Sequence, residues 1–170
     1  METGCEPPRI VAGMPMYNEE ETIGTVVTMA LRHVDEVICI DDGSSDSSAR
    51  IAEACGATVI RHRGNQGYGA ALKTLFKTTR NSDTDVLVVL DSDGQHDTTD
   101  IPKLIQPILD EEADFTIGSR FVEGGEGNDM PAYRRLGIKV ITAASNLTSD
   151  LDIKDTPVSY THLTLPTTLV

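Results

Sequence analysis

The chain has few basic residues. Its 14 lysines and arginines stand against 27 aspartates and glutamates, which gives a formal net charge of −13 over 170 residues. Such a charge disfavours nucleic acid and anionic lipid, so neither is expected as an electrostatic partner. We interpret the excess of acidic residues as a solvated, halophile-like surface, which bears on solubility and habitat and not on mechanism.

Cysteine is scarce as well. The chain has three, Cys5, Cys39 and Cys55, an odd number without the Cys-x-x-Cys or Cys/His spacing of a metal site. We therefore expect reduced thiols. Because Cys39 lies inside an apolar run, we expect it to be a small core residue.

Long hydrophobic runs are absent, and none approaches the length that spans a bilayer. The first residues, METGCEPPR, lack the basic and apolar regions of a signal peptide. These features predict a cytoplasmic protein, or one peripherally associated with the cytoplasmic face of a membrane. A hydrophobic content of 39% and a length of 170 residues predict one soluble, globular domain.

Short apolar strands alternate with helical segments along the chain, which predicts right-handed crossovers and a parallel sheet covered on both faces, an α/β fold. The expected strands are Arg9–Met14, Glu36–Asp41, Thr58–His62, Asp85–Leu90 and Asp114–Phe121. The expected helices begin at Asn18, Asp46, Gly67, Asp100 and Pro131. Asn18 with Glu21 three residues later predicts a capping box for the first helix.

The stretch VLVVLDSDGQHD (86–97) is the most informative part of the chain. Its apolar run is typical of a strand buried on both faces, and it stops at Asp91 and Asp93. Gly94 permits a sharp turn there, and Gln95 offers a neutral oxygen. Carboxylates leaving a strand end can converge on one hard divalent cation, so we predict a metal site formed by these side chains.

Asp-x-Asp also arises by chance in an acidic chain, and it occurs twice more. Asp83 with Asp85 precedes the apolar run in a polar loop, and Asp150 with Asp152 lies in an Asn, Thr and Ser-rich stretch. We interpret both as solvated surface. Asp91 with Asp93 is the pair that ends a buried-type strand.

Polar clusters follow two other expected strands, and adjacent strand ends of a parallel sheet face the same crevice. The first cluster contains Pro15, Tyr17, Asn18 and Glu19, and the second contains Asp41 and Asp42. Carboxylates accept hydrogen bonds from a base or from ribose hydroxyls, and a tyrosine can pack on a flat ring. Together these residues suit a nucleotide. Helix capping by Asn18 and Glu19, and a turn at Asp41–Gly43, are open alternatives.

Two further features are candidate phosphate contacts. The glycines of Gly64–Gly69, Gly67 and Gly69 among them, open a helix and can present free N–H groups to an anion, although a turn or packing role explains them equally well. Arg120 follows Gly118 and Ser119 at the end of the fifth expected strand and is a candidate for a charged contact.

The chain resembles family 2 glycosyltransferases with the GT-A fold, especially dolichyl-phosphate and polyprenyl-phosphate sugar synthases. The resemblance covers about residues 10–156 and rests on five motifs in family order: Pro-x-Tyr-Asn-Glu at 15–19, Asp-Asp-Gly-Ser at 41–44, Gly-Asn-x-Gly-x-Gly at 64–69, Asp-x-Asp-Gly-Gln at 91–95 and Gly-Ser-Arg at 118–120. It implies a three-layer, Rossmann-like α/β/α sandwich with a mostly parallel sheet.

The resemblance also implies roles for the motif residues. Nucleotide contacts would come from Pro15, Tyr17, Glu19, Asp41 and Asp42. Contacts to Mg²⁺ or Mn²⁺ and a diphosphate would come from Asp91, Asp93 and Gln95, with Arg120 facing the diphosphate or sugar. The implied reaction moves a sugar, mannose or glucose favoured, from a GDP- or UDP-sugar to a lipid phosphate or glycan acceptor with inversion.

The resemblance weakens after Thr156. Residues 157–170 contain no Asp, Glu, Lys or Arg and are rich in threonine, so we expect a foreign-looking tail after a catalytic domain over residues 1–156 that is incomplete on the acceptor side. A β segment is the alternative for this tail. A sugar-nucleotide-binding remnant without turnover is therefore an open alternative for the whole chain.

Two other enzyme classes fit less well. An NAD-dependent oxidoreductase needs a glycine fingerprint after the first strand, where Met14-Pro15 stands. A Mg²⁺-dependent phosphoryl-aspartate domain could use Asp41, Asp42 and Asp91, but the order of the remaining motifs disfavours it.

Overall fold

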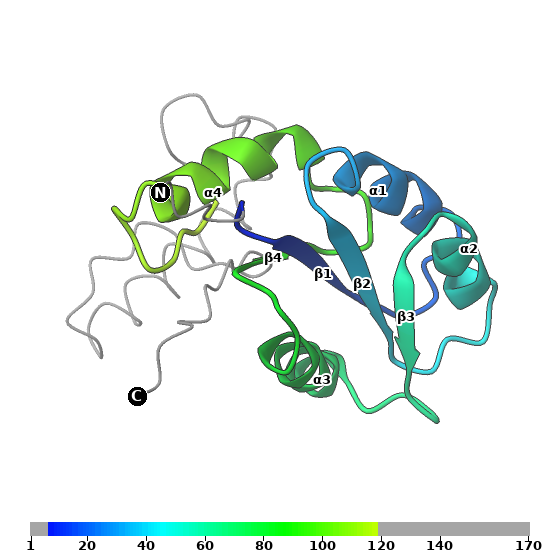
Figure 1. Ribbon diagram of the computed structural model, residues 1–170. Helices are drawn as coiled ribbons and strands as arrows, with labels where there is room; N and C mark the ends of the chain where they lie inside the picture. The colour runs from blue at the N-terminus through cyan, green and yellow to red at the C-terminus, as the bar shows by residue number, and fades with distance from the viewer. Residues whose placement is uncertain (1–6, 119–170) are drawn as a thin grey trace, which may run out of the picture. The chain divides into compact units, whose positions relative to one another are not determined.

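The computed structural model describes residues 7–118, which form a parallel sheet with helices on both faces (Figure 1). The strands are β1 (Ile10–Met16), β2 (Glu36–Asp41), β3 (Thr58–Arg61) and β4 (Val86–Val89). The helices are α1 (Ile23–Ala30), α2 (Ser48–Ala54), α3 (Tyr68–Arg80) and α4 (Ile101–Leu109), the last preceded by the 3-10 turn η1 (Thr98–Asp100). This alternation confirms the predicted α/β fold.

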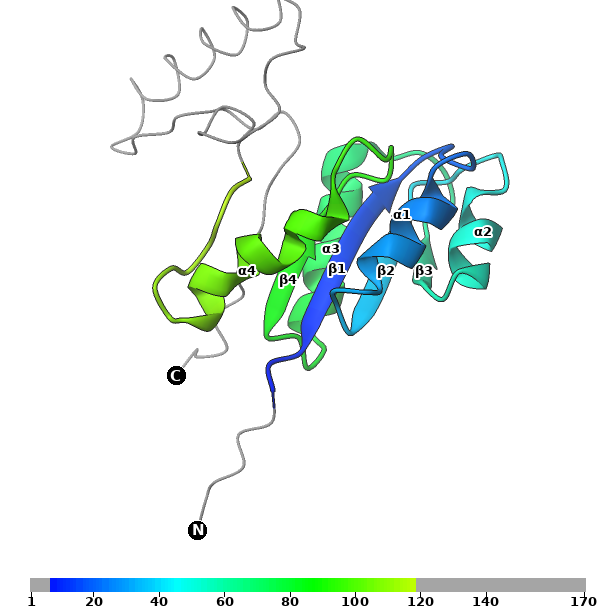
Figure 2. The same cartoon turned by 90° about the horizontal axis from the view of Figure 1, so that it is seen from above.

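The strands lie in the order β3-β2-β1-β4, and every pair is parallel. Val11 pairs with Glu36 of β2, while Ile10 pairs with Val86 of β4. Helices α1, α2 and α4 cover one face and α3 covers the other, which gives three layers (Figures 1 and 2). The sides on which α1, α2 and α3 lie are those that right-handed crossovers between the described strands require.

Side chains alternate between two cores because successive strand residues point to opposite faces. Met14 and Val88 pack on one face with Ile23 of α1 and Ile101 of α4. On the other face, buried residues of the strands pack against α3: Val11, Ile40, Leu87 and Val89 surround Ala71 and Leu75. A Cβ at Gly13 would lie 2.4 Å from Leu75 Cδ2, so this glycine lets α3 approach β1 closely.

Strand β1 runs two residues further than predicted and includes Pro15. The carbonyl of Gly13 accepts a hydrogen bond on the β4 side, and alternate residues of a strand face the same neighbour. Pairing with β4 stops at Gly13 with Val89, so the missing N–H of Pro15 faces a side where the sheet has no strand. A proline is therefore tolerated within this strand.

The predicted capping box at Asn18 and Glu21 is wrong. Helix α1 begins at Ile23, with Thr22 as the N-cap residue. Asn18 has a left-handed φ of 55°, and its Oδ1 accepts a hydrogen bond from the backbone N–H of Ser45. The side chain expected to cap its own helix thus binds a loop 27 residues away.

The strand predicted over Asp114–Phe121 is not formed in its described part, residues 114–118. After α4 the chain turns at Glu111, whose φ is 58°, and Thr116 Oγ1 donates to the carbonyl of Leu104. This bond holds the segment against α4, and Phe115 is 52% exposed. The helix expected from Pro131 lies outside the described residues.

The described cysteines, Cys39 and Cys55, are free thiols, as predicted. Burial in the core and the nearby charge of Asp41 raise the pKa of Cys39 to about 12, so this thiol stays protonated. Of the helices within residues 7–118, none combines the length and the apolar character that crossing a membrane requires.

Candidate functional site

Three strands end side by side and carry the predicted polar residues. Strand β1 leads into Tyr17, β2 ends at Asp41, and β4 is followed after Leu90 by Asp91. The sheet order reverses beside β1, because β2 and β3 extend the sheet on one side and β4 on the other. Open α/β sheets bind ligands beyond the carboxyl strand ends at such a reversal. We name residues 17–19, 41–45, 62–68 and 91–96 the carboxyl-edge loops.

Pro15 lies within β1 and ties it to the loop after β4. Its carbonyl accepts a 2.9 Å hydrogen bond from Oγ of Ser92, whose side chain is buried. The carbonyl of Ser92 in turn accepts a 2.8 Å hydrogen bond from Thr22 Oγ1. The loop that carries Asp91 and Asp93 is therefore fixed to β1 and to the start of α1.

The residues after β1 lie against the loop after β2. The N–H of Asn18 donates to Ser44 Oγ at 3.0 Å, and the N–H of Glu19 donates to Ser48 Oγ at 2.7 Å. Tyr17 is 46% exposed at this edge. The two loops thus fix one another and leave the ring of Tyr17 open to a ligand.

Asp41 is fully buried. Its Oδ1 accepts a 2.8 Å hydrogen bond from the N–H of Ser44. Arg61 Nε lies 3.0 Å from Oδ2, close enough to pair the charges, although Oδ2 has no hydrogen-bond donor among residues 7–118. The guanidinium of Arg61 donates instead to the carbonyl of Ser44. Within the described part of the chain, Asp41 Oδ2 is therefore a buried acceptor without a hydrogen-bond donor.

Asp42 is also buried, but its oxygens are engaged. The carboxylate accepts hydrogen bonds from His62 Nδ1 at 2.7 Å and from the N–H groups of Gln66 and Gly67. Burial opposes ionisation of Asp42, yet these hydrogen bonds outweigh it and hold the pKa of the carboxyl below its ordinary value. Asp42 thus stays ionised, with 4% of its surface exposed.

The glycine-rich segment does not present all its N–H groups to solvent. The N–H of Gly67, a candidate phosphate contact, donates instead to the carboxylate of Asp42 at 2.7 Å. Gly67 has a φ of 90°, a conformation that favours glycine. Gly69 lies in the first turn of α3, with open space where a Cβ would stand.

Asp91 and Asp93 flank the buried Ser92 and are both partly exposed. Asp93 Oδ1 accepts a hydrogen bond from the N–H of Gln95, and Gly94 has a φ of 75°, so the chain turns sharply here as predicted. Gln95, in the same turn, is exposed. Both carboxylates are thus placed at one strand end.

Asp91 has two neighbours that the sequence did not reveal as partners. The Tyr68 hydroxyl donates to Asp91 Oδ1 at 3.3 Å, and His96 Nε2 lies 3.7 Å from Oδ2. Partial burial, the charge of Asp91 and this hydrogen bond raise the pKa of Tyr68 to about 12, so the phenol keeps its proton. His62 was missed too, although it directly follows β3, the neighbour of β2.

The donor atoms at Asp91 and Asp93 suit a divalent cation. Carboxylate oxygens, with the amide oxygen of Gln95, are the hard ligands that Mg²⁺ and Mn²⁺ prefer. Residues 7–118 contain no group of three or more His, Cys, Asp or Glu side chains that could enclose a metal. Mg²⁺ often binds through one or two carboxylates and completes its shell with water and substrate phosphates. The residues therefore fit a cation held jointly with a diphosphate.

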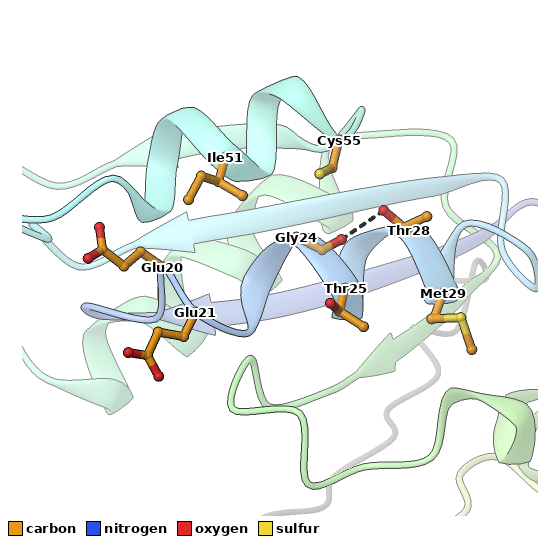
Figure 3. Close-up of a pocket in the computed structure, with 8 residues that line it drawn as sticks. All are labelled: Glu20, Glu21, Gly24, Thr25, Thr28, Met29, Ile51 and Cys55. Carbon is orange, nitrogen blue, oxygen red and sulfur yellow. Dashed lines mark hydrogen bonds between the residues drawn. The ribbon is translucent and has the colours of Figure 1, made fainter.

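A groove of about 510 Å³ lies elsewhere, between α1 and α2 (Figure 3). Ile51 of α2 and Cys55, which directly follows this helix, line it opposite Gly24 and Thr28 of α1, and Thr28 Oγ1 donates to the carbonyl of Gly24. None of the predicted site residues within 7–118 lines this groove. The carboxyl-edge loops are therefore the candidate site.

The comparison with protein families decides the class. Residues 12–161 match the family described as "Glycosyl transferase family 2". The chain belongs to glycosyl transferase family 2. This confirms the family that the five motifs indicated.

Among the family's curated members, a dolichol-phosphate mannosyltransferase of Pyrococcus furiosus is 35% identical over 156 residues, which are 86% of this chain and 43% of the relative. A UDP-N-acetylglucosamine–dolichyl-phosphate N-acetylglucosaminyltransferase of Methanococcus voltae is 32% identical and covers 73% of this chain and 57% of the relative. The chain spans about half the length of the curated relatives it matches.

A solved glycosyltransferase structure shares the fold. Glucosyl-3-phosphoglycerate synthase of Mycobacterium tuberculosis, in complex with Mn²⁺, UDP-glucose and phosphoglyceric acid, matches with a TM-score of 0.65 at 25% identity, over 92% of this chain and 56% of that one. The expected GT-A fold is thereby confirmed. Arg120 and the predicted boundary at 156 lie outside the described residues.

Proposed function

We propose that the chain carries the nucleotide-sugar site of an inverting glycosyltransferase. The enzyme would move a sugar, mannose or glucose favoured, from a GDP- or UDP-sugar to a polyprenyl or dolichyl phosphate or a glycan. The observation that carries this proposal is that Asp41 and the pair Asp91 and Asp93 lie on either side of β1, where the sheet order reverses. One end of that edge suits a base and the other suits a diphosphate.

On the base side, Asp41 Oδ2 would accept from a base N–H, since it pairs with the Arg61 guanidinium but has no hydrogen-bond donor within residues 7–118. The exposed ring of Tyr17 packs on the base, and Glu19 accepts from the ribose hydroxyls. Both oxygens of Asp42 already accept hydrogen bonds, so this carboxylate would support the base side indirectly, by holding the Gly67 segment in place.

On the diphosphate side, Asp91 and Asp93 would hold Mg²⁺ or Mn²⁺ together with Gln95. When bound, the cation neutralises charge that develops on the departing nucleotide diphosphate. A lipid phosphate is already anionic, so it can attack the sugar directly without a general base. Direct displacement inverts the anomeric centre. Arg120 is proposed to face the diphosphate or the sugar.

The names of two relatives support the acceptor class, since the Pyrococcus and Methanococcus proteins are named for transfer to dolichyl phosphate. Transfer to a lipid phosphate would take place at the cytoplasmic face of a membrane. A second candidate function is sugar-nucleotide binding without transfer, which is favoured by the change of composition after Thr156.

Calorimetry with GDP-, UDP- and dTDP-sugars, with and without Mn²⁺, tests the proposal. We expect one nucleotide class to bind more tightly with Mn²⁺, and binding of none would contradict it. A transfer assay with the bound donor and a polyprenyl phosphate then separates the two candidates. Labelled lipid product supports the transferase, whereas donor binding without product supports the binding protein.

A further inference from the structure

Tyr68 and Asp91 lie in different elements of the fold, 23 residues apart in the sequence. Tyr68 is the first residue of α3, which covers one face of the sheet, and Asp91 follows β4. The Tyr68 hydroxyl donates to Asp91 Oδ1 at 3.3 Å. The glycine-rich segment that leads into α3 therefore reaches the diphosphate side of the site through one side chain.

The position of Tyr68 is set by Asp42. The carboxylate of Asp42 binds the N–H groups of Gln66 and Gly67, and Gly67 immediately precedes Tyr68. The left-handed φ of Gly67 then turns the chain into α3. A buried charge at the end of β2 thus fixes the backbone directly before Tyr68, which is 52% exposed.

Asp91 needs such a partner to act in a precise geometry. Rotation about the last side-chain bond of an aspartate is broad, so the plane of a carboxylate is set by its hydrogen bonds. Oδ1 takes the hydrogen bond from Tyr68, and each carboxylate oxygen has a second lone pair. The opposite oxygen, Oδ2, faces His96 at 3.7 Å, which is longer than a hydrogen bond.

We propose that Tyr68 is a positioning residue for Asp91, which fixes the carboxylate for the divalent cation of the donor complex. This inference rests on the proposed function and deepens it. Groups that orient a metal ligand through hydrogen bonds change metal affinity by about 10- to 100-fold when they are removed. The link from Asp42 through Gly67 to Tyr68 would also join the base side of the site to its diphosphate side.

The test is the effect of Mn²⁺ on nucleotide affinity. UDP and GDP are titrated into the full chain by calorimetry with and without Mn²⁺, for the wild type, Tyr68→Phe and Tyr68→Leu. The first substitution removes the hydroxyl alone, and the second removes the ring as well. We expect both variants to lose about 10-fold of the Mn²⁺-dependent gain in affinity, with the affinity measured without metal unchanged.

The outcomes separate the inference from the proposed function. If Tyr68→Phe keeps the full Mn²⁺ effect and Tyr68→Leu loses it, the aromatic ring and not the hydroxyl supports metal binding. The positioning role of the hydroxyl is then refuted. Equal loss of affinity with and without metal would show a structural role and also refute it. If the wild type binds neither nucleotide, or binds without any Mn²⁺ effect, the metal-dependent donor site fails and the inference fails with it.

Discussion

Nδ1 of His62 lies 2.7 Å from Oδ1 of Asp42, and this pair joins the end of β3 to the end of β2. Nε2 of the same imidazole lies 2.8 Å from Thr74 Oγ1 in α3. With the hydrogen bonds from Gln66 and Gly67, Asp42 thus holds together the strand and helix ends on the base side of the site.

Replacing Asp42 by asparagine should lower stability in a pH-dependent way. Hydrogen bonds to a charged group contribute about 1.5–3 kcal/mol each, so we expect a loss of about 2 kcal/mol or more at pH 7. The pKa of Asp42 in the folded chain is lowered, so its contribution is complete above the unfolded value of about 3.9 and is lost as the pH falls through the folded value. Urea denaturation between pH 7 and 3 measures the difference.

The matched control is Asp83→Asn, which changes an exposed aspartate in the polar loop before β4. Its stability should stay within about 0.5 kcal/mol of the wild type across the same pH range. An Asp42→Asn deficit that keeps its full size at pH 3 would refute the ionised, hydrogen-bonded Asp42.

Gly43 and Gly64 should respond differently to alanine. Gly43 has a φ of 80°, and a Cβ there would lie 2.6 Å from the backbone of Gly64, which cannot retreat as a side chain can. A left-handed non-glycine residue alone costs roughly 1–2 kcal/mol, so Gly43→Ala should lower stability by more than that. A Cβ on Gly64 meets nothing within 4 Å, and Gly64→Ala should change stability by less than about 0.5 kcal/mol. Equal effects in urea denaturation would contradict the close approach.

The contact between Gly13 and Leu75 can be measured by a double-mutant cycle. Gly13→Ala forces the buried Leu75 side chain to move and should cost about 1–3 kcal/mol, while Leu75→Ala should cost about 2–5 kcal/mol. In the double variant the shortened side chain at position 75 leaves room for the new methyl group at position 13. The loss of stability in the double variant should therefore be smaller than the sum of the two single losses. Additive costs would show that α3 does not rest on Gly13.

Much of this fold follows from local sequence. Strand β2 has the predicted bounds, Glu36–Asp41, because its apolar run ends sharply at acids and a turn. Helix α2 ends before Gly56, whose φ of 99° is the left-handed stop that a glycine predicts. The metal-ligand candidates Asp91 and Asp93 could be chosen because a buried strand ends in front of them.

The remaining features depend on partners far away in the sequence. Asn18 looks like a helix cap, but the N–H of Ser45 takes its side chain. Pro15 looks like a strand end, yet β1 stays paired with β2 as far as Met16. The proline is tolerated because β4 has already stopped on the side that its missing N–H faces. The contact of Tyr68 with Asp91 follows only once the strand order is known, because it crosses from α3 to the loop after β4.

The central claim is that Asp91 belongs to a metal-dependent nucleotide-sugar site. The most direct measurement is the affinity of the preferred sugar nucleotide for Asp91→Asn and Asp83→Asn, with and without Mn²⁺. Both substitutions neutralise one aspartate of an Asp-x-Asp pair, but Asp83 lies in an exposed loop before β4. We expect Asp91→Asn to abolish the Mn²⁺-dependent gain in affinity and Asp83→Asn to retain it. An Asp91→Asn chain that binds the donor with unchanged metal dependence would contradict the assignment.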